Sequence, residues 1–183
     1  MLVAGGFGVG KTTLVGAVSE IRPLHTEELM TEAGSGVDDI RRIEQKTTTT
    51  VAMDFGRITL SQGTVLYLFG TPGQDRFWFM WEELSRGALG AVVLIDTRRI
   101  EASFAAIDYF EHRSDPFIVA VNRFQDAYDY TAEEIRDALD IAPEVPIVLC
   151  DARRRESAKE VLVALIEHAM RRPGHPDEAQ AYA

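Results

Sequence analysis

Hydrophobic and polar positions along this chain alternate in two different periods, which predict β-strands and α-helices in turn. Short apolar runs typical of buried strands are separated by longer stretches in which apolar residues recur at helical spacing. We expect strands at residues 2–4, 48–60, 64–69, 90–96, 117–121 and 145–150, and helices at residues 12–21, 75–86, 99–112, 131–140 and 155–172. This order predicts an α/β domain with a largely parallel sheet of six strands.

Three segments depart from this simple alternation. The strands at 48–60 and 64–69 are joined by the tight turn Ser61-Gln62-Gly63, which predicts an antiparallel hairpin. The polar stretch 22–46 is longer than most loops of a compact domain, so we expect it to be functional or mobile, and partly helical. The strand at 2–4 is shorter than a usual central strand, which leaves open a natural start upstream.

Length and composition are those of one soluble globular domain. The chain has 183 residues, of which 46% are hydrophobic and 26% charged. We expect one domain at residues 1–172, followed by a frayed tail at 173–183 that contains helix breakers and few large apolar groups.

The charge balance and the single cysteine limit the class of partner and the compartment. A formal net charge of −10 disfavours nucleic acid and anionic lipid surfaces as partners. Cys150 cannot form an intrachain disulfide, which favours a reducing compartment. We find no signal peptide, no membrane-spanning run and no lipidation cysteine, so we expect a cytoplasmic protein without a direct membrane anchor, recruited to membranes only through partners.

A glycine-rich segment lies between the first strand and the first helix. Residues 5–12, GGFGVGKT, fulfil the phosphate-loop pattern GxxxxGK[ST] in the context that this pattern requires. Backbone amides of such a loop point at phosphate oxygens, Lys11 supplies a positive charge, and Thr12 offers a hydroxyl to Mg²⁺. The expected nucleotide contacts are Gly5, Phe7, Gly8, Val9, Gly10, Lys11, Thr12 and Thr13. The pattern alone does not separate kinases, ATPases and GTPases.

The chain resembles the Ras-like small GTPases over nearly its whole length. The resemblance rests on the hairpin after the first helix and on the segment GTPGQDRF at 70–77. Within that superfamily the segment KTTTTVAMDF at 46–55 resembles the bacterial branch, the MglA-type and actinobacterial conservon-type proteins. The resemblance implies a three-layer P-loop G domain that binds GTP or GDP with Mg²⁺, hydrolyses GTP slowly, and acts as a switch in bacterial signalling.

The resemblance also assigns roles around the γ-phosphate. It implies that Thr50 ligates Mg²⁺ and senses the γ-phosphate, with Thr49 as the fallback. It implies that the Gly73 amide meets the γ-phosphate, that Gln74 orients the attacking water, and that Lys11 stabilises the charge on the phosphates.

One residue of this metal site departs from the family. Gly70 stands where the D-x-x-G-Q element has its aspartate, which predicts weaker metal binding, slower turnover, or a carboxylate supplied from elsewhere. Asp96, at the end of an apolar strand, is one candidate replacement and also the basis of an ATPase alternative. We favour a helix-capping role over a metal role for Asp96, and we likewise assign no metal role to Asp54 from the sequence.

Phe7 is a second departure from the family. It occupies the loop position where many members have glycine, past which a partner's arginine reaches the phosphates, so its ring is expected to obstruct that route. Arg57, Arg76 and Arg98 are candidates to act within the chain, although solvation at the surface is the favoured interpretation for each.

The base-reading motif is altered as well. The family's N-K-x-D appears as Asn122, Arg123, Phe124 and Gln125, with Asp126 displaced by one residue. The segment CDAR at 150–153 resembles the family's S-A-K loop, whose alanine amide contacts the base. The implied base-end contacts are Asn122, Arg123, Gln125, Asp151, Ala152 and Arg153. Guanine is favoured, and the alternatives are an ATPase or promiscuous NTPase and a non-hydrolysing nucleotide-binding scaffold.

An aromatic cluster comes after the switch glutamine at residues 77–81, FWFMW. It predicts either a partner surface that changes with the nucleotide or ordinary core packing. The resemblance implies regulators of the roadblock-domain type, and effectors that bind through the switch regions.

Overall fold

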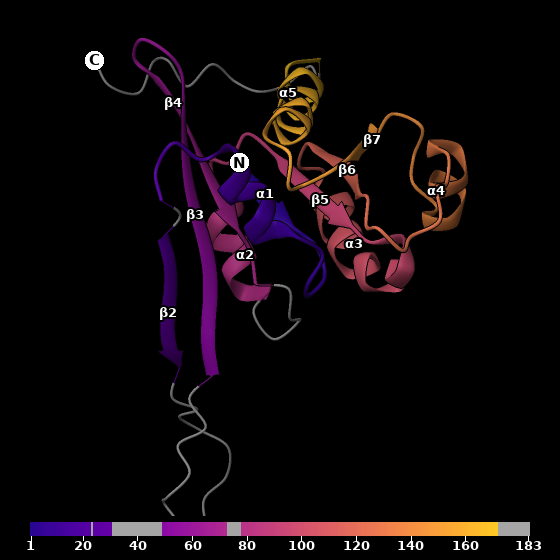
Figure 1. Ribbon diagram of the computed structural model, residues 1–183, viewed down its shortest axis with the longest axis horizontal. Helices are drawn as coiled ribbons and strands as arrows, with labels where there is room; N and C mark the ends of the chain where they lie inside the picture. The colour runs from indigo at the N-terminus through magenta and orange to yellow at the C-terminus, as the bar shows by residue number, and fades with distance from the viewer. Residues whose placement is uncertain (23, 31–48, 73–77, 172–183) are drawn as a thin grey trace, which may run out of the picture.

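The computed structural model describes residues 1–22, 24–30, 49–72 and 78–171 (Figure 1). Its strands are β1 (Leu2–Ala4), β2 (Leu24–Met30), β3 (Thr49–Ser61), β4 (Thr64–Gly70), β5 (Ala91–Ile95), β6 (Phe117–Asn122) and β7 (Ile147–Cys150). Its helices are α1 (Lys11–Val18), α2 (Trp78–Ser85), the 3-10 helix η2 (Thr97–Ser103), α3 (Phe104–Arg113), α4 (Ala132–Leu139) and α5 (Arg155–Arg171). The predicted tail at 173–183 lies outside the described residues.

The described strands form one seven-stranded mixed sheet in the order β2-β3-β4-β1-β5-β6-β7. Strand β1 lies between β4 and β5 and is parallel to both, and the parallel pairing continues through β6 and β7. Strands β3 and β4 are antiparallel, as the turn signal predicts. The α/β P-loop fold is therefore confirmed, and all six predicted strands are present.

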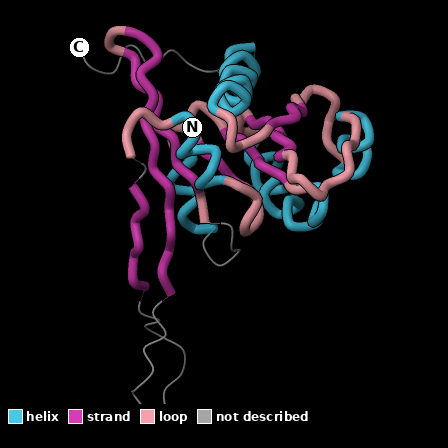
Figure 2. Tube along the Cα trace, viewed as in Figure 1, coloured by secondary structure: helices cyan, strands magenta, loops and turns pink. Residues whose placement is uncertain are grey.

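The seventh strand corrects an expectation from the sequence. Strand β2 falls in the polar stretch expected to be an irregular or partly helical loop, and it pairs antiparallel with β3 from Leu24↔Phe55 to Met30↔Thr49. Backbone amide and carbonyl groups at the edge of β3 need hydrogen-bond partners, and a polar segment supplies them as readily as an apolar one. Together the two strands form a long ribbon that projects from the body of the domain (Figure 1, Figure 2).

Helices cover both faces of the sheet and divide the core in two. One buried cluster joins α1 and α5 to residues such as Val3, Leu68 and Leu94. The other joins α2, α3 and α4 to the opposite face, where Trp81 packs against Tyr109 and Phe110 with ring centroids 5.3 and 6.0 Å apart. Figure 2 shows these helices flanking the strands, which gives the three layers predicted from the resemblance.

The aromatic cluster after the switch glutamine is described only in part. Trp81 is a core residue, 3% exposed, which agrees with the packing interpretation for this position. Residue Phe77 lies outside the described residues, as do the side chains of 78–80. Cys150 is buried at the end of β7, and no helix among the described residues is long and apolar enough to cross a membrane.

Candidate functional site

The glycine-rich loop leaves the carboxyl end of β1 and enters α1 through backbone conformations that glycine adopts without strain. Gly5 has φ +130°, and a Cβ at this position would lie 2.1 Å from the Leu94 carbonyl oxygen. Gly10, the N-cap of α1, has φ +105°. The loop can therefore lie tightly against β5 and present the first amides of α1, where the positive end of the helix dipole favours an anion.

Lys11 folds back into this loop. Its Nζ donates to the carbonyl oxygens of Gly5 and Gly6 at 2.8 and 2.7 Å. Burial lowers the pKa of Lys11 to about 8, and the negative charge of Asp54 opposes that shift. The loop thus contains a half-buried cation whose hydrogen-bond partners are the loop's own carbonyl groups.

Thr12 is oriented by a carboxylate on the neighbouring hairpin. Its Oγ1 donates to Oδ2 of Asp54 at 2.6 Å, and Asp54 is only 6% exposed. Hydroxyl and carboxylate oxygens are the ligand types that Mg²⁺ prefers, so the donor set at this point fits that ion. Among the described residues, no group of three or more acidic, histidine or cysteine side chains is placed to hold a metal ion.

The predicted γ-phosphate residues are placed only in part. Thr50 lies in β3, where its backbone pairs with Leu29 in the ribbon. Gly73 and Gln74 lie outside the described residues. Thr71, shortly before them in the chain, lies beside the start of the glycine loop, where its amide donates to the Val3 carbonyl at 2.9 Å.

Asn122 joins the loop to the base end of the site. Its Nδ2 donates to the Val9 carbonyl at 2.9 Å, and its Oδ1 accepts from the Ala152 amide at 3.0 Å. A Cβ on Gly10 would lie 2.6 Å from the Asn122 amide nitrogen, so glycine at that position makes room for the bridge. The structure therefore brings Val9, Gly10, Asn122 and Ala152 together. The Ala152 amide, to which the resemblance assigns a contact with the base, donates to Asn122 in this structure.

The remaining base-end residues lie on exposed loops. Asp151 accepts from the Arg153 side chain at 2.8 and 2.9 Å, and this arginine holds the pKa of Asp151 at about 2. The Arg123 guanidinium lies 3.7 Å from the exposed carboxylate of Asp129. Gln125 is exposed. These contacts define the shape of the loops but do not by themselves select guanine or adenine.

Asp96 is a helix cap, as the favoured interpretation expects. It accepts from the Arg98 backbone amide at 3.0 Å and from Arg98 Nε and Nη2 at 2.9 and 2.8 Å. Arg99 adds an ion pair at 3.7 Å. The carboxylate is thus paired with two guanidinium groups, which favours the capping role over the metal role for Asp96.

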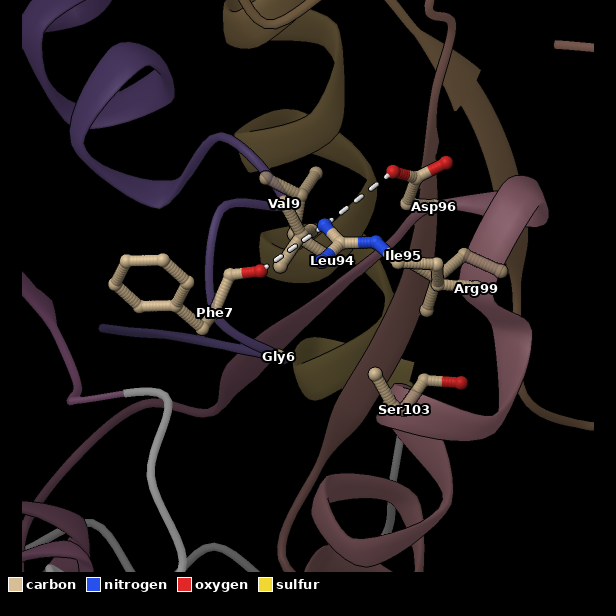
Figure 3. A pocket seen from close by; sticks show the side chains of 9 residues that line it. Gly6, Phe7, Val9, Leu94, Ile95, Asp96, Arg99 and Ser103 are labelled. Atoms are coloured by element: carbon tan, nitrogen blue, oxygen red, sulfur yellow. Dashed lines mark hydrogen bonds and ion pairs between the residues drawn. The ribbon is translucent and has the colours of Figure 1, made fainter.

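Arg99 is a residue that the sequence patterns did not single out. Its Nη2 donates to the Phe7 carbonyl at 3.1 Å and ties the outer side of the glycine loop to Asp96, as Figure 3 shows. The Phe7 ring is 73% exposed and points away from this contact (Figure 3). Arg98, one of the predicted cis arginines, instead lies over the Phe124 ring at 4.0 Å. No sequence pattern marks Arg99, because its contact with the Phe7 carbonyl depends on how the fold places η2 beside the glycine loop.

Comparison with known proteins agrees with this geometry. A family model described as "Conserved hypothetical ATP binding protein" matches residues 3–172, so the chain belongs to that family. An uncharacterized protein of Methanocaldococcus jannaschii, MJ1339, is 28% identical over 170 residues, 92% of this chain and 95% of that protein.

Solved structures with this fold include G domains. The cytosolic domain of the T. maritima FeoB iron transporter in a GDP form superposes with a TM-score of 0.64 at 18% identity, covering 93% of this chain. This chain spans only 63% of that domain. The FeoB G-domain of Methanococcus jannaschii gives 0.60 at 13% identity, over 92% of this chain and 96% of that one. These likenesses establish a GTPase-like P-loop fold, and the family match supports nucleotide binding.

Proposed function

We propose that this protein is a slow GTPase that acts as a nucleotide-dependent molecular switch in bacterial signalling. The observation that carries the proposal is the glycine loop itself, with the Lys11 ammonium held inside it and the Thr12 hydroxyl oriented beside it. Such a loop binds the phosphates of a nucleotide whatever the base is. The Ras-like arrangement of the hairpin beside it favours the switch class over kinases.

The residues of the chain divide the chemistry in a simple way. Loop amides and Lys11 stabilise the charge on the phosphates, and Thr12 is the first candidate to hold Mg²⁺, which when bound neutralises phosphate charge. Gln74 is proposed to orient water, and Gly73 to contact the γ-phosphate. The Phe7 ring on the exposed side of the loop obstructs a partner's arginine, so we propose that hydrolysis is slow and that the triphosphate state persists.

The switch proposal rests on the position of Thr50. It lies four residues before Asp54 on an extended strand, so about 13 Å of strand separates their backbones at roughly 3.3 Å per residue. While β2 and β3 are paired, Thr50 is therefore remote from Thr12. Engagement of Thr50 with Mg²⁺ and the γ-phosphate requires this part of the ribbon to rearrange, which gives the protein two states that a nucleotide can select.

The choice of base separates the main rivals. The description of the family favours ATP, and the absence of an in-register carboxylate after Asn122 permits an ATPase or promiscuous NTPase. The FeoB structures in a GDP form favour guanine, as does the resemblance of the loop at 150–153. We place guanine first on the resemblance of this loop and on the fold shared with the FeoB G domains, and the ATPase alternative stays open to the test below.

The resemblance to the MglA-type and conservon-type branch of the small GTPases also supports a proposal for the partners. Its regulators are roadblock-domain proteins, and its effectors bind through the switch regions. We place the protein in the cytoplasm, with membrane recruitment through these partners. A roadblock-domain protein should bind the triphosphate and diphosphate forms with different affinities. Equal affinity for the triphosphate and diphosphate forms, or an affinity that Trp78→Ala leaves unchanged, would argue against the aromatic cluster at residues 77–81 as the partner surface.

The test of the proposed function is calorimetric titration of nucleotide-free protein with GDP, a non-hydrolysable GTP analogue and the matching ATP analogue in Mg²⁺. We expect at least a roughly hundredfold preference for guanine, about 2.7 kcal/mol. Lys11→Ala should abolish binding, whereas Lys159→Ala, a matched control on the exposed side of α5, should not. Equal or better binding of the ATP analogue would favour the ATPase alternative. Tight binding with no phosphate released from GTP or ATP, in a separate hydrolysis assay, would favour the scaffold.

A further inference from the structure

Two consecutive arginines of η2 are held by one carboxylate, that of Asp96 at the end of β5. Arg98 Nε and Nη2 donate to this carboxylate at 2.9 and 2.8 Å, and Arg99 Nη2 lies 3.7 Å from Asp96 Oδ2. The Asp96 side chain is 3% exposed, whereas those of Arg98 and Arg99 are 39% and 49% exposed. A buried carboxylate therefore anchors two guanidinium groups that lie nearer the surface.

Arg99 contacts the outer side of the phosphate loop. Its Nη2 donates to the Phe7 carbonyl at 3.1 Å (Figure 3), and a Cβ built on Gly8 would lie 3.4 Å from the same nitrogen. The peptide bond between Phe7 and Gly8 is trans, so the Phe7 carbonyl and the Gly8 amide point in opposite directions. Because Arg99 holds that carbonyl outward, the Gly8 amide is directed to the inner side of the loop, where the phosphates of the proposed nucleotide lie.

Arg98 contacts the base segment, residues 122–125. Its guanidinium carbon lies 4.0 Å from the centroid of the Phe124 ring, which is within the range of a cation–π contact. The hydrogen bond with Asp96 raises the pKa of Arg98, and the negative charge of Asp126 adds to this rise. Asp126 is the carboxylate that is displaced by one residue in the base-reading motif. Arg98 therefore constrains the base segment at the point where its motif is altered.

We propose that Asp96, Arg98 and Arg99 form one positioning cluster, the Asp96 cluster, that holds both ends of the nucleotide site. Arg99 positions the phosphate loop, Arg98 positions the base segment and so contributes to base selection, and Asp96 joins the two. The inference rests on the proposed nucleotide binding. All three are positioning residues in this role, and none is assigned a contact with the reacting atoms.

The test of the phosphate arm compares two diphosphates that differ only in the base. Nucleotide-free, full-length protein is titrated calorimetrically with GDP and with ADP in Mg²⁺, which gives two dissociation constants and their ratio. Arg99→Ala should weaken both nucleotides by about tenfold and leave the ratio unchanged, because the phosphates are common to both. Arg99→Lys keeps a cation that can donate to the Phe7 carbonyl, and it should bring both constants to within about threefold of wild type.

The base arm is tested by Arg98→Ala. This change should move the ratio of the two dissociation constants toward one by about threefold to tenfold, since the Phe124 ring loses the group that holds it. An arginine with a merely structural role would lower both affinities together or neither. Arg113→Ala is the matched control, because Arg113 donates to Asp115 at 2.8 Å and lies 5.6 Å from the Tyr109 ring, at the end of α3. It should leave both dissociation constants unchanged.

Asp96→Asn tests whether Asp96 joins the two arms. Its amide keeps an oxygen that can cap η2 but loses the charge that holds both arginines. The variant should therefore weaken both nucleotides and also move the ratio toward one. Adding Arg99→Ala to it should weaken binding by less than about threefold more, because Arg99 is already released. Losses that simply multiply in D96N/R99A would overturn the joining role of Asp96.

The outcomes separate this inference from the proposed function. If the wild type binds neither GDP nor ADP, the proposed function fails and this inference with it. If the wild type binds and Arg98→Ala and Arg99→Ala both titrate like it, only the inference is overturned. A wild-type ratio near one overturns the role of Arg98 in base selection, and a preference for ADP overturns the GTPase proposal alone. Should Asp96→Asn not fold, judged by its circular dichroism melt, the two arginine variants decide.

Discussion

Replacing Asn122 by alanine should destabilise the folded protein by about 2–4 kcal/mol. The side chain is 6% exposed, and it makes two hydrogen bonds between segments far apart in the sequence, to the Val9 carbonyl at 2.9 Å and from the Ala152 amide at 3.0 Å. Two such bonds contribute roughly 1–3 kcal/mol together, and each buried group left without a partner adds about 1–3 kcal/mol before water relieves it. The expected loss of 2–4 kcal/mol lies at the lower end of the sum of these contributions, because water that enters the space left by the truncated side chain can pair with the Val9 carbonyl and the Ala152 amide.

The assay is urea unfolding of the Asn122→Ala variant and the wild type, monitored by circular dichroism with nucleotide removed. The slope of the unfolding free energy against urea concentration should be the same for both proteins, because the substitution removes contacts but does not change the surface exposed on unfolding. Gln125→Ala is the matched control, an amide truncation in the same loop at an exposed position, and should change stability by less than about 0.5 kcal/mol. A loss under about 1 kcal/mol for Asn122→Ala would refute the bridging role.

Three further outcomes are expected. The pKa of Lys11 is about 8 in the free protein, and a bound phosphate should raise that pKa because it stabilises the charged ammonium. Nucleotide affinity should therefore fall as the pH rises above about 8, and binding near that pH should take up a proton. Calorimetric titration in two buffers of different ionisation enthalpy measures the proton uptake, and an affinity that stays constant to about pH 9.5 would contradict the prediction. Cys150 is buried, which raises the pKa of its thiol to about 12, so a disulfide reagent should modify unfolded but not native protein, and rapid native labelling would argue against its burial. Asp96→Ala removes a helix cap and should cost about 1–2 kcal/mol in urea unfolding, whereas Asp96→Asn, which keeps an acceptor, should cost less.

The order of elements and the phosphate loop were accessible from the sequence because both depend on local chemistry. Apolar runs and helical periods reveal which segments a core buries, and these patterns located six strands and the helices between them. The loop at 5–12 is recognisable because several glycines, a lysine and a threonine must occur at fixed spacing to surround a phosphate. The cap role of Asp96 was also a local inference, since the groups it satisfies come directly after it in the chain.

Contacts between distant segments were decided only by the tertiary structure. Strand β2 has no apolar pattern, and it forms because the edge of β3 offers unpaired backbone groups. Arg99 reaches Phe7 across 92 positions of the chain, and Thr12 reaches Asp54 across 42. In the linear sequence Gly70 is a lost aspartate; in the folded hairpin it is the space that Asp54 fills, because the register of two antiparallel strands places these positions side by side.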